Sequence, residues 1–215
     1  MPMKSFAQCG LYTFVDVAYL GGRSPSELAQ QLCDGGSDVI QLRAKTSTHD
    51  EIRRMAEAIL PRTTRAGVGL VINDHPDIAR SVGAMCCHLG QEDFFEAGLV
   101  SAAEVTGLPP AFSLGLSTHS PEQALRAVRA EPAYVAIGPV FATLTKPGRP
   151  AVTLDYVRWA ARNVNIPWFA IGGITLNNLD SVLEAGARRI CVVSAILQAP
   201  DVVRACQQFQ ERLAS

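Results

Sequence analysis

Eight short apolar runs, separated by helical patterns, constrain the fold of this chain more than any other feature of its sequence. Most of the runs lack the alternation of apolar and polar residues that marks a half-exposed strand, which is typical of parallel strands covered on both faces. Helical stretches between them predict a repeated strand–helix unit. The runs are Leu11–Val15, Val39–Leu42, Gly69–Ile72, Met85–Leu89, Ala111–Leu116, Tyr134–Ile137, Trp168–Ile171 and Ile190–Val193.

Capping residues mark the boundaries of the helices between these runs. Three helix starts carry a hydroxyl residue followed three positions later by Glu or Gln, the pattern of a capping box. These starts are Ser24-Pro25-Ser26-Glu27, Thr48-His49-Asp50-Glu51 and Ser120-Pro121-Glu122-Gln123. Helix ends are indicated by Gly35-Gly36, Gly67, Gly83 and Gly186. The fourth unit is the weakest, because residues 94–106 give only a short helical pattern.

Repeated strand–helix units permit either a closed barrel or an open, doubly wound sheet. Eight units in 215 residues, with no G-x-G-x-x-G after the first run, favour closure. We therefore predict an α/β fold, a (β/α)8 TIM barrel, with residues 1–215 forming one domain.

The charge balance excludes several classes of partner. Lys and Arg total 19 against 20 Asp and Glu, so the chain lacks the basic surface of a nucleic-acid or membrane-surface binder. No apolar stretch is long enough for a signal peptide or a membrane span, and the six cysteines show no C-x-x-C or zinc-ligand spacing. We expect a cytoplasmic, reduced protein whose anionic ligands are bound by local groups.

The active site of a barrel lies at the carboxyl ends of its strands, where the second run is followed by cations. Gln41, Arg43 and Lys45 alternate along the chain, so their side chains can share one side of the strand. Two cations and an amide suit a diphosphate. Taken alone, the pattern is equally typical of two solvated surface charges.

Carboxylates follow the third and fourth runs. Asn73 and Asp74 come after one, and Glu92 and Asp93 after the next. Asn73 alone is best explained as a helix cap. Two carboxylates from adjacent strands would repel unless a cation lay between them, which predicts Mg²⁺ with substrate phosphates completing its shell. Spacing does not distinguish Glu92 from Asp93.

The fifth and sixth runs are followed by hydroxyls and one cation. Ser117 can donate to a phosphate, whereas His119 is either an acid–base group or a local hydrogen-bonding residue. The loop 138–150 is long enough to suggest function, and its Thr143, Thr145 and Lys146 make it a candidate lid.

The last two runs end in small residues. Gly172-Gly173 allows a ligand to approach the backbone closely, and Val193-Ser194 begins a short helix. Backbone N–H groups in these two loops form the phosphate site of many barrels. A tight turn without a ligand is the alternative for the glycine pair.

Seven of these segments, in order along nearly the whole chain, resemble the thiamine-phosphate synthase family, also called thiamine-phosphate pyrophosphorylase. Any one segment could arise by chance, but seven in the same order are specific. The segments are Gln41-Leu42-Arg43-x-Lys45, Asn73-Asp74, His88-Leu89-Gly90-Gln91-Glu92-Asp93, Ser117-Thr118-His119-Ser120, Gly138-Pro139-Val140-Phe141-x-Thr143-x-Thr145-Lys146, Ala170-Ile171-Gly172-Gly173-Ile174 and Val193-Ser194-Ala195-Ile196, where x is a position that the resemblance leaves open.

The resemblance implies a transferase that joins 4-amino-2-methyl-5-hydroxymethylpyrimidine diphosphate to a thiazole phosphate, giving thiamine phosphate and pyrophosphate. It implies Mg²⁺ as cofactor, held by Asp74 and Asp93. It implies Arg43, Lys45, Ser117 and Lys146 as catalytic residues. The implied substrate-binding positions are Gln41, Leu42, Arg43, Ala44, Lys45, Asn73, Ser117, Thr143, Leu144, Thr145, Lys146, Gly173, Val193 and Ser194. Small-molecule substrates are the expected partners, and a homodimer is an expectation that no residue in the sequence specifies.

The chain departs from the family pattern at two positions. Ala44 stands where the family usually has Glu, and His75 stands where it commonly has Arg. Three alternatives remain open: a thiazole tautomerase, in which His119 would carry the proton; another phosphate-handling barrel, such as a sugar-phosphate isomerase; and a catalytically silent binding protein.

Overall fold

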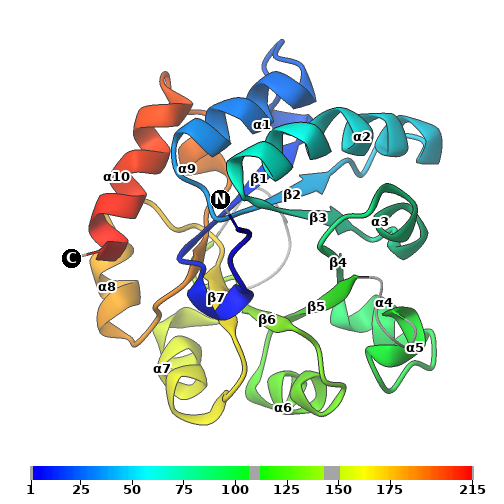
Figure 1. Ribbon diagram of the computed structural model, residues 1–215. Helices are drawn as coiled ribbons and strands as arrows, with labels where there is room; N and C mark the ends of the chain where they lie inside the picture. The colour runs from blue at the N-terminus through cyan, green and yellow to red at the C-terminus, as the bar shows by residue number, and fades with distance from the viewer. Residues whose placement is uncertain (1, 107–111, 143–150, 215) are drawn as a thin grey trace.

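The structure, a computed structural model, describes residues 2–106, 112–142 and 151–214. Within them eight parallel strands form a closed barrel in sequence order, and β1 pairs with β8 to complete the ring (Figure 1). The strands are β1 (Leu11–Asp16), β2 (Val39–Arg43), β3 (Gly69–Asn73), β4 (Cys86–Leu89), β5 (Ser113–Thr118), β6 (Tyr134–Ile137), β7 (Trp168–Ile171) and β8 (Ile190–Cys191). The predicted (β/α)8 barrel is therefore confirmed.

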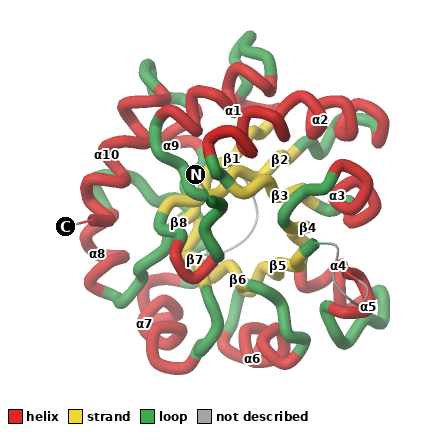
Figure 2. The backbone as a smooth tube through the Cα atoms, viewed as in Figure 1, coloured by secondary structure: helices red, strands yellow, loops and turns green. Residues whose placement is uncertain are grey.

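Helices surround the barrel on its outside, as the ring of red elements around the yellow strands in Figure 2 shows. Two short 3-10 helices, η1 (Phe6–Gln8) and η2 (Val17–Tyr19), flank β1. The α-helices are α1 (Pro25–Asp34), α2 (His49–Ala66), α3 (Pro76–Val82), α4 (Gln91–Glu96), α5 (Ala103–Thr106), α6 (Pro121–Arg129), α7 (Thr153–Asn163), α8 (Leu179–Glu184), α9 (Ser194–Leu197) and α10 (Val202–Ala214). Among the described residues, no helix is long and apolar enough to cross a membrane.

The predicted helix caps are present. Ser24 and Thr48 each complete a capping box with the Glu three residues later. Ser120 caps α6 by accepting from the backbone N–H of Gln123, but the Gln123 side chain accepts from the His119 backbone instead of closing the box. The weak fourth unit is indeed broken into α4 and α5.

Several strands extend past the apolar runs that predicted them. β1, β2 and β3 each continue for one polar residue, so Asp16, Arg43 and Asn73 are the last residues of their strands. The strand ladder depends on backbone hydrogen bonds, which continue where the side chains turn from apolar to polar. The polar residues expected after these strands therefore stand on the rigid barrel wall.

The amino-terminal segment closes the end of the barrel opposite to the active-site end. Phe6 is 5% exposed, and its ring lies 4.6 Å from that of Tyr134 and 6.4 Å from that of Phe169, both inside the barrel. In Figure 1 this dark blue segment lies in front of the ring, over β7. Because that end is filled, the barrel interior is accessible at the carboxyl ends of the strands.

Candidate active site

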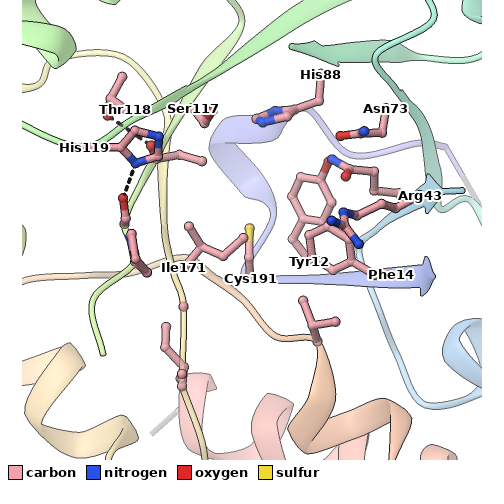
Figure 3. Close-up of a pocket in the computed structure, with 18 of the residues that line it drawn as sticks. Tyr12, Phe14, Arg43, Asn73, His88, Ser117, Thr118, His119, Ile171 and Cys191 are labelled. Carbon is pink, nitrogen blue, oxygen red and sulfur yellow. Dashed lines mark hydrogen bonds between the residues drawn. The ribbon is translucent and has the colours of Figure 1, made fainter. Parts of the chain in front are cut away.

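A pocket at the carboxyl ends of the strands takes lining residues from every strand–helix unit (Figure 3). Its lining includes the buried aromatic side chains Tyr12 and Tyr134 of the barrel interior, together with strand ends and the loops that follow them. The residues that line it are Tyr12, Phe14, Gln41, Arg43, Asn73, His88, Ser117, Thr118, His119, Tyr134, Ala136, Gly138, Pro139, Ile171, Gly172, Gly173, Ile174, Cys191, Val193 and Ser194.

Nearly half of the predicted site residues come together in this pocket. Segments that are far apart in the sequence meet because parallel strands bring their carboxyl ends to one rim. The predicted residues that line the pocket are Gln41, Arg43, Asn73, Ser117, Gly173, Val193 and Ser194. Their convergence is a structural finding, whereas their individual roles in binding stay predictions.

Other predicted residues lie beside the pocket or outside the described chain. Leu42 and Ala44 are buried in the hydrophobic core, on the opposite side of β2 from Gln41 and Arg43, so only their backbone is placed to contact a substrate. Lys45, Asp74 and Asp93 stand at the rim and are not lining residues. The predictions for Thr143, Leu144, Thr145 and Lys146 lie outside the described residues.

Arg43 is held by a buried carboxylate that the sequence analysis did not identify. The Arg43 Nη1 atom donates to Asp16 Oδ2 at 2.7 Å, and Asp16 is only 1% exposed. The two residues are partners in the β1–β2 register, which explains why they meet. Asp16 could have been found as the polar residue directly after the first apolar run. The pair fixes the guanidinium at the pocket wall.

Lys45, Asn73 and Asp74 form a second polar group at the same rim. The Lys45 ammonium and the Asn73 amide both donate to Asp74 Oδ2, the amide at 2.7 Å. Asp74 has a left-handed backbone with φ 65°, an uncommon conformation that a non-glycine residue adopts at some cost. That conformation turns the chain from β3 towards α3 and leaves the carboxylate facing Lys45.

Asp93 and Glu92 occupy the first turn of α4 at the neighbouring unit. The Asp93 carboxylate folds back over Gly90, where a Cβ atom would meet its Oδ2 at 2.5 Å. Asp93 is exposed, whereas Glu92 is half-buried with its Oε1 4.0 Å from His119 Nε2. The two acids therefore differ in surroundings, as their spacing in the sequence did not reveal.

His119 lies at the pocket edge and is fixed by its neighbours. Its Nδ1 lies 2.5 Å from the Gly138 carbonyl oxygen, and its backbone N–H donates to Gln123 Oε1 at 2.7 Å (Figure 3). Ser117, two residues earlier on β5, is 6% exposed and faces the pocket. This arrangement presents a hydroxyl and an imidazole on the wall opposite Arg43.

The pocket floor is a chain of buried polar side chains. Gln41 donates to the Tyr12 hydroxyl at 2.8 Å, which lies 3.0 Å from the Tyr134 hydroxyl, which in turn lies 2.9 Å from His88 Nδ1. Burial raises the pKa of both tyrosine hydroxyls, so they stay neutral and keep their hydrogen bonds. Both tyrosines stand in apolar runs, where the sequence offered no signal of a polar role.

Gly172 and Gly173, directly after β7, allow the loop that follows β7 to pack closely against the loop that follows β6. A Cβ atom on Gly172 would lie 2.5 Å from Pro139, and one on Gly173 would lie 2.8 Å from the Ala142 carbonyl oxygen. Val140 and Phe141 donate backbone hydrogen bonds to the β7 end at 2.8 and 3.0 Å. The absence of a Cβ atom at these glycines is thus needed for packing against this loop. Both glycines also line the pocket, so the close approach to a ligand expected from the sequence stays a prediction.

The β8 end presents backbone donors. Val193 is the N-cap of α9, and Ser194 is its first residue. The first N–H groups of a helix have no partner within the helix, so they can bind an anion. Gly173, Val193 and Ser194 lie on the same pocket wall, which provides amides rather than charged side chains.

The pocket offers no activated nucleophile among its described residues. Cys191 faces the pocket, but burial raises its thiol pKa well above the usual value, so the reactive thiolate is disfavoured. Ser117 makes no hydrogen bond to a base in the described part of the chain. The described lining therefore offers groups that suit an anion, with Arg43 and amide side chains on one wall and backbone N–H groups on the other.

The chain matches a known family model, and it is similar to several known proteins. Residues 11–196 match the family model described as thiamine monophosphate synthase. The chain is 50% identical to the thiamine-phosphate synthase of Thermus thermophilus over 187 residues, covering 83% of this chain and 84% of that protein. It is 45% identical to that of Acidothermus cellulolyticus over 214 residues, covering 98% of each. The structure of a thiamine phosphate pyrophosphorylase from Pyrococcus furiosus superimposes with a TM-score of 0.85 at 26% identity, covering 98% of both chains.

Proposed function

The chain belongs to the thiamine monophosphate synthase family, and we propose that it joins a pyrimidine diphosphate to a thiazole phosphate to give thiamine phosphate and pyrophosphate. The observation that carries this proposal is the pocket itself, whose lining includes two chemically different groups of residues, polar and charged side chains at β1–β3 and backbone N–H groups at β7–β8. One wall suits a diphosphate and the other a single phosphate. A condensation of two phosphorylated substrates needs both.

The first wall fits the pyrimidine diphosphate. Arg43 offers a planar fork that is oriented in advance by Asp16, and Lys45 offers a mobile point charge at the rim. Asn73 and Gln41 add amide groups, and Ser117 adds a hydroxyl across the pocket. Lys146, which follows β6 in the sequence, is proposed as a third cation.

The second wall fits the thiazole phosphate. Backbone N–H groups at Gly173, Val193 and Ser194 bind a phosphate without a charged side chain. Thr143 and Thr145 are proposed to add hydroxyl contacts. A phosphate held by amides loses little affinity to side-chain ordering, because the backbone is already rigid.

We propose Mg²⁺ as the cofactor, held by Asp74 and Asp93. Both side chains offer carboxylate oxygens, the donors that Mg²⁺ prefers, and both stand at the rim at the ends of the adjacent strands β3 and β4. When bound, the ion neutralises charge on the diphosphate leaving group. The Lys45 ammonium pairs with the Asp74 carboxylate, so this carboxylate already accepts a positively charged group at the rim of the pocket.

The residues of the pocket support a dissociative substitution. The bond between the pyrimidine methylene carbon and the diphosphate oxygen breaks, and its electron pair leaves with pyrophosphate. The resulting resonance-stabilised carbocation is then attacked by the thiazole nitrogen, which forms the new carbon–nitrogen bond. This route requires no protein nucleophile, only stabilisation of the leaving charge and alignment of the second substrate. Arg43 and Lys45 provide the first, and the amide wall provides the second.

Two expectations about the whole protein, its cellular location and its oligomeric state, complete the proposal. We propose a cytoplasmic location, in keeping with buried free thiols and small anionic substrates. We also propose a homodimer, which sedimentation equilibrium of the purified protein would reveal as a mass of twice 23.0 kDa. A monomeric mass would remove the second expectation without affecting the first.

The direct test supplies both substrates with Mg²⁺ and measures pyrophosphate and thiamine phosphate together. Equal amounts of the two products are expected, and none without Mg²⁺. Asp93→Ala should abolish Mg²⁺-dependent turnover and leave the fold intact, because the side chain is exposed in a six-residue helix. Glu96→Ala, an exposed acid at the end of the same helix, is the matched control. Release of no pyrophosphate by the unmodified protein would disprove the synthase, and near-normal turnover of Asp93→Ala would remove this residue from the metal site.

A further inference from the structure

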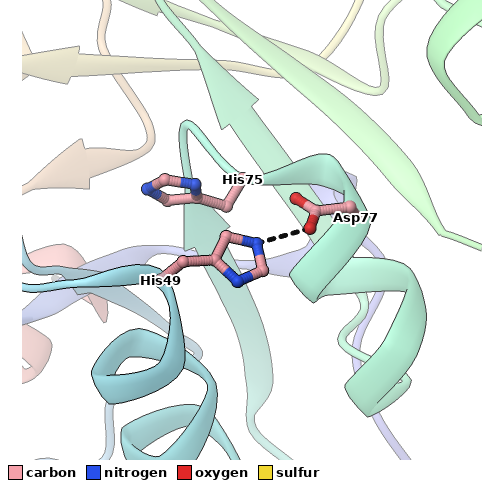
Figure 4. A group of neighbouring side chains, drawn as sticks. All are labelled: His49, His75 and Asp77. Atoms are coloured by element: carbon pink, nitrogen blue, oxygen red, sulfur yellow. Dashed lines mark hydrogen bonds and ion pairs between the residues drawn. The ribbon is translucent and has the colours of Figure 1, made fainter.

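Two histidines and an aspartate converge at the starts of two neighbouring helices, outside the pocket. His49 is the first residue of α2, His75 is the N-cap of α3, and Asp77 is the second residue of α3. One ligand atom from each of the three lies within 4.8 Å of the others. Figure 4 shows the His49 ring extending from α2 towards Asp77, with His75 beside it. We call these three residues the His-His-Asp cluster.

The fold brings the cluster together for a simple reason. β2 and β3 are paired in parallel, so the helices that follow them begin at the same rim. Thr48 caps α2 with the help of Glu51, which fixes the backbone at His49. Pro76, the first residue of α3, lies between His75 and Asp77 and fixes the backbone of the first turn. The positions of the three Cα atoms therefore depend on rigid elements rather than on a loose loop.

The side chains already interact with each other. His49 Nε2 lies 2.5 Å from Asp77 Oδ2, and the rings of His49 and His75 are 5.7 Å apart and nearly perpendicular. The His49 and Asp77 side chains are 44% and 60% exposed, so both can rotate and exchange this hydrogen bond for another ligand. A cluster of this kind is either a helix-to-helix hydrogen bond or the apo form of a metal site.

We propose that the His-His-Asp cluster binds one divalent transition-metal ion of the Zn²⁺ type. Two imidazoles and one carboxylate, with a fourth position open to water, form a common zinc coordination set. Bond lengths near 2.0–2.2 Å place neighbouring ligand atoms about 3.3 Å apart around a tetrahedral ion. To reach that geometry the His49 and Asp77 atoms, now 2.5 Å apart, must separate by about 0.8 Å, and His75, within 4.8 Å of both, must approach by at most about 1.5 Å. Metal binding replaces the hydrogen bond between His49 and Asp77, because both atoms that form it then coordinate the ion.

Ligand chemistry separates this site from the proposed magnesium site. Imidazole nitrogen favours Zn²⁺, Co²⁺, Ni²⁺ and Cu²⁺, whereas Mg²⁺ prefers oxygen. Asp74 and Asp93 offer only carboxylate oxygen, so the two sites should select different ions. His75 is adjacent to Asp74 in sequence, but its ring belongs to the cluster that faces α2.

The helix ends make the carboxylate necessary. The starts of α2 and α3 carry partial positive charge, which opposes a cation beside them. Asp77 offsets this charge within the site, and Asp50 adds a second carboxylate in the first turn of α2. Loss of Asp77 should therefore weaken metal binding as strongly as loss of either histidine.

The test uses the full-length protein after treatment with a chelator, in buffer containing excess Mg²⁺. Calorimetry with Zn²⁺ and an optical titration with Co²⁺ should each show one equivalent bound, and Co²⁺ should give the visible bands of a four-coordinate ion with nitrogen and oxygen ligands. His49→Gln, His75→Gln and Asp77→Asn should each reduce affinity by more than about 100-fold, beyond the effect usual for residues that only support a ligand. His119→Gln, which removes a histidine outside the cluster, should keep full affinity.

Several results would overturn the proposal. They are binding of Zn²⁺ no tighter than that of Mg²⁺, an equal loss in His119→Gln, or a cobalt–thiolate band, which would place the ion on a cysteine. Retained affinity in both His49→Gln and Asp77→Asn would also refute it. These two variants alter exposed side chains at helix starts, so circular dichroism should show an intact fold, and they decide the question even where His75→Gln unfolds. None of these readouts depends on turnover, so failure here leaves the proposed synthase activity unaffected.

Discussion

The two walls of the pocket offer different groups to an anion. The wall at β1–β3 uses charged side chains that are already paired: Arg43 with buried Asp16, and Lys45 with Asp74. The wall at β7–β8 has Gly173, Val193 and Ser194, which contribute backbone groups and no ionised side chain. On the first wall, a cation can exchange its carboxylate partner for an arriving polyanion. On the second wall, the positions of the N–H groups are fixed by backbone geometry.

The difference shows which part of the chain determines specificity on each wall, the side chains or the backbone. On the charged wall, a substitution removes a group without moving the chain, so binding and stability can change separately. On the amide wall, the binding groups are the chain itself, so a substitution acts through backbone shape. The predictions below test this contrast.

Replacement of Arg43 by Ala should have the largest effect, because it leaves the Asp16 carboxylate buried and unpaired. Breaking a buried ion pair in this way costs about 3–5 kcal/mol of unfolding free energy, measurable by urea denaturation. Turnover should also be lost. Adding Asp16→Asn should recover part of the stability but none of the turnover, and a loss below about 1 kcal/mol in the single variant would contradict the assignment.

Replacement of Lys45 by Ala should affect binding and not folding. Its side chain is 51% exposed, and an exposed ion pair contributes less than about 1 kcal/mol to stability. Pyrophosphate binding in the presence of Mg²⁺, followed by calorimetry, should weaken by about 2–3 kcal/mol through loss of one charge-assisted contact. Arg158→Ala, which removes an exposed pair with Asp155 on α7, is the matched control and should bind normally.

Replacement of Gly173 by Ala should alter the amide wall through its backbone. Its φ is 65°, and the new Cβ atom would lie 2.8 Å from the Ala142 carbonyl oxygen and from Phe141 Cβ. A loss of about 2 kcal/mol in unfolding free energy is expected, with a higher KM for the thiazole phosphate. Gly22→Ala, at φ 85° with open space around it, isolates the backbone cost of about 1 kcal/mol. Equal losses in both variants would mean that the close packing at Gly173 is unimportant.

The smallest expected effect is a difference in salt dependence. Raising the ionic strength from about 0.05 to about 0.5 M screens exposed charges strongly, so the KM for the pyrimidine diphosphate should rise several-fold. The KM for the thiazole phosphate should rise less, because in the proposed site its phosphate is bound by amides and not by cations. Parallel slopes in steady-state kinetics would remove the distinction between the two walls.

Most of the fold could be predicted from the sequence, because strand burial and helix caps are local signals. Each apolar run corresponds to a strand, and Ser24, Thr48 and Ser120 cap helices as expected. The ends of the strands were less predictable. At Asp16 and Arg43 the side chains become polar while the backbone ladder continues, so an apolar pattern stops too early.

The site could be predicted in part. Residues that are polar at strand ends, such as Arg43 and Ser117, converge as expected because a barrel brings those ends together. Partners across the barrel could not be predicted, since Tyr12 and Tyr134 resemble core residues until the closed ring places their hydroxyls 3.0 Å apart. The packing role of Gly172 could not be predicted for the same reason, because the loop that packs against it comes from another part of the chain.

The seam between β1 and β8 has a consequence for how the protein is made. Leu11 pairs with Ile190, and β8 consists of only two residues. A nascent chain on the ribosome must therefore wait for its last strand before the ring can close, and contacts between such distant residues are slow to form. Until that moment β1 presents an unpaired edge, and a chaperone that shields this edge would be expected to increase the yield of active protein.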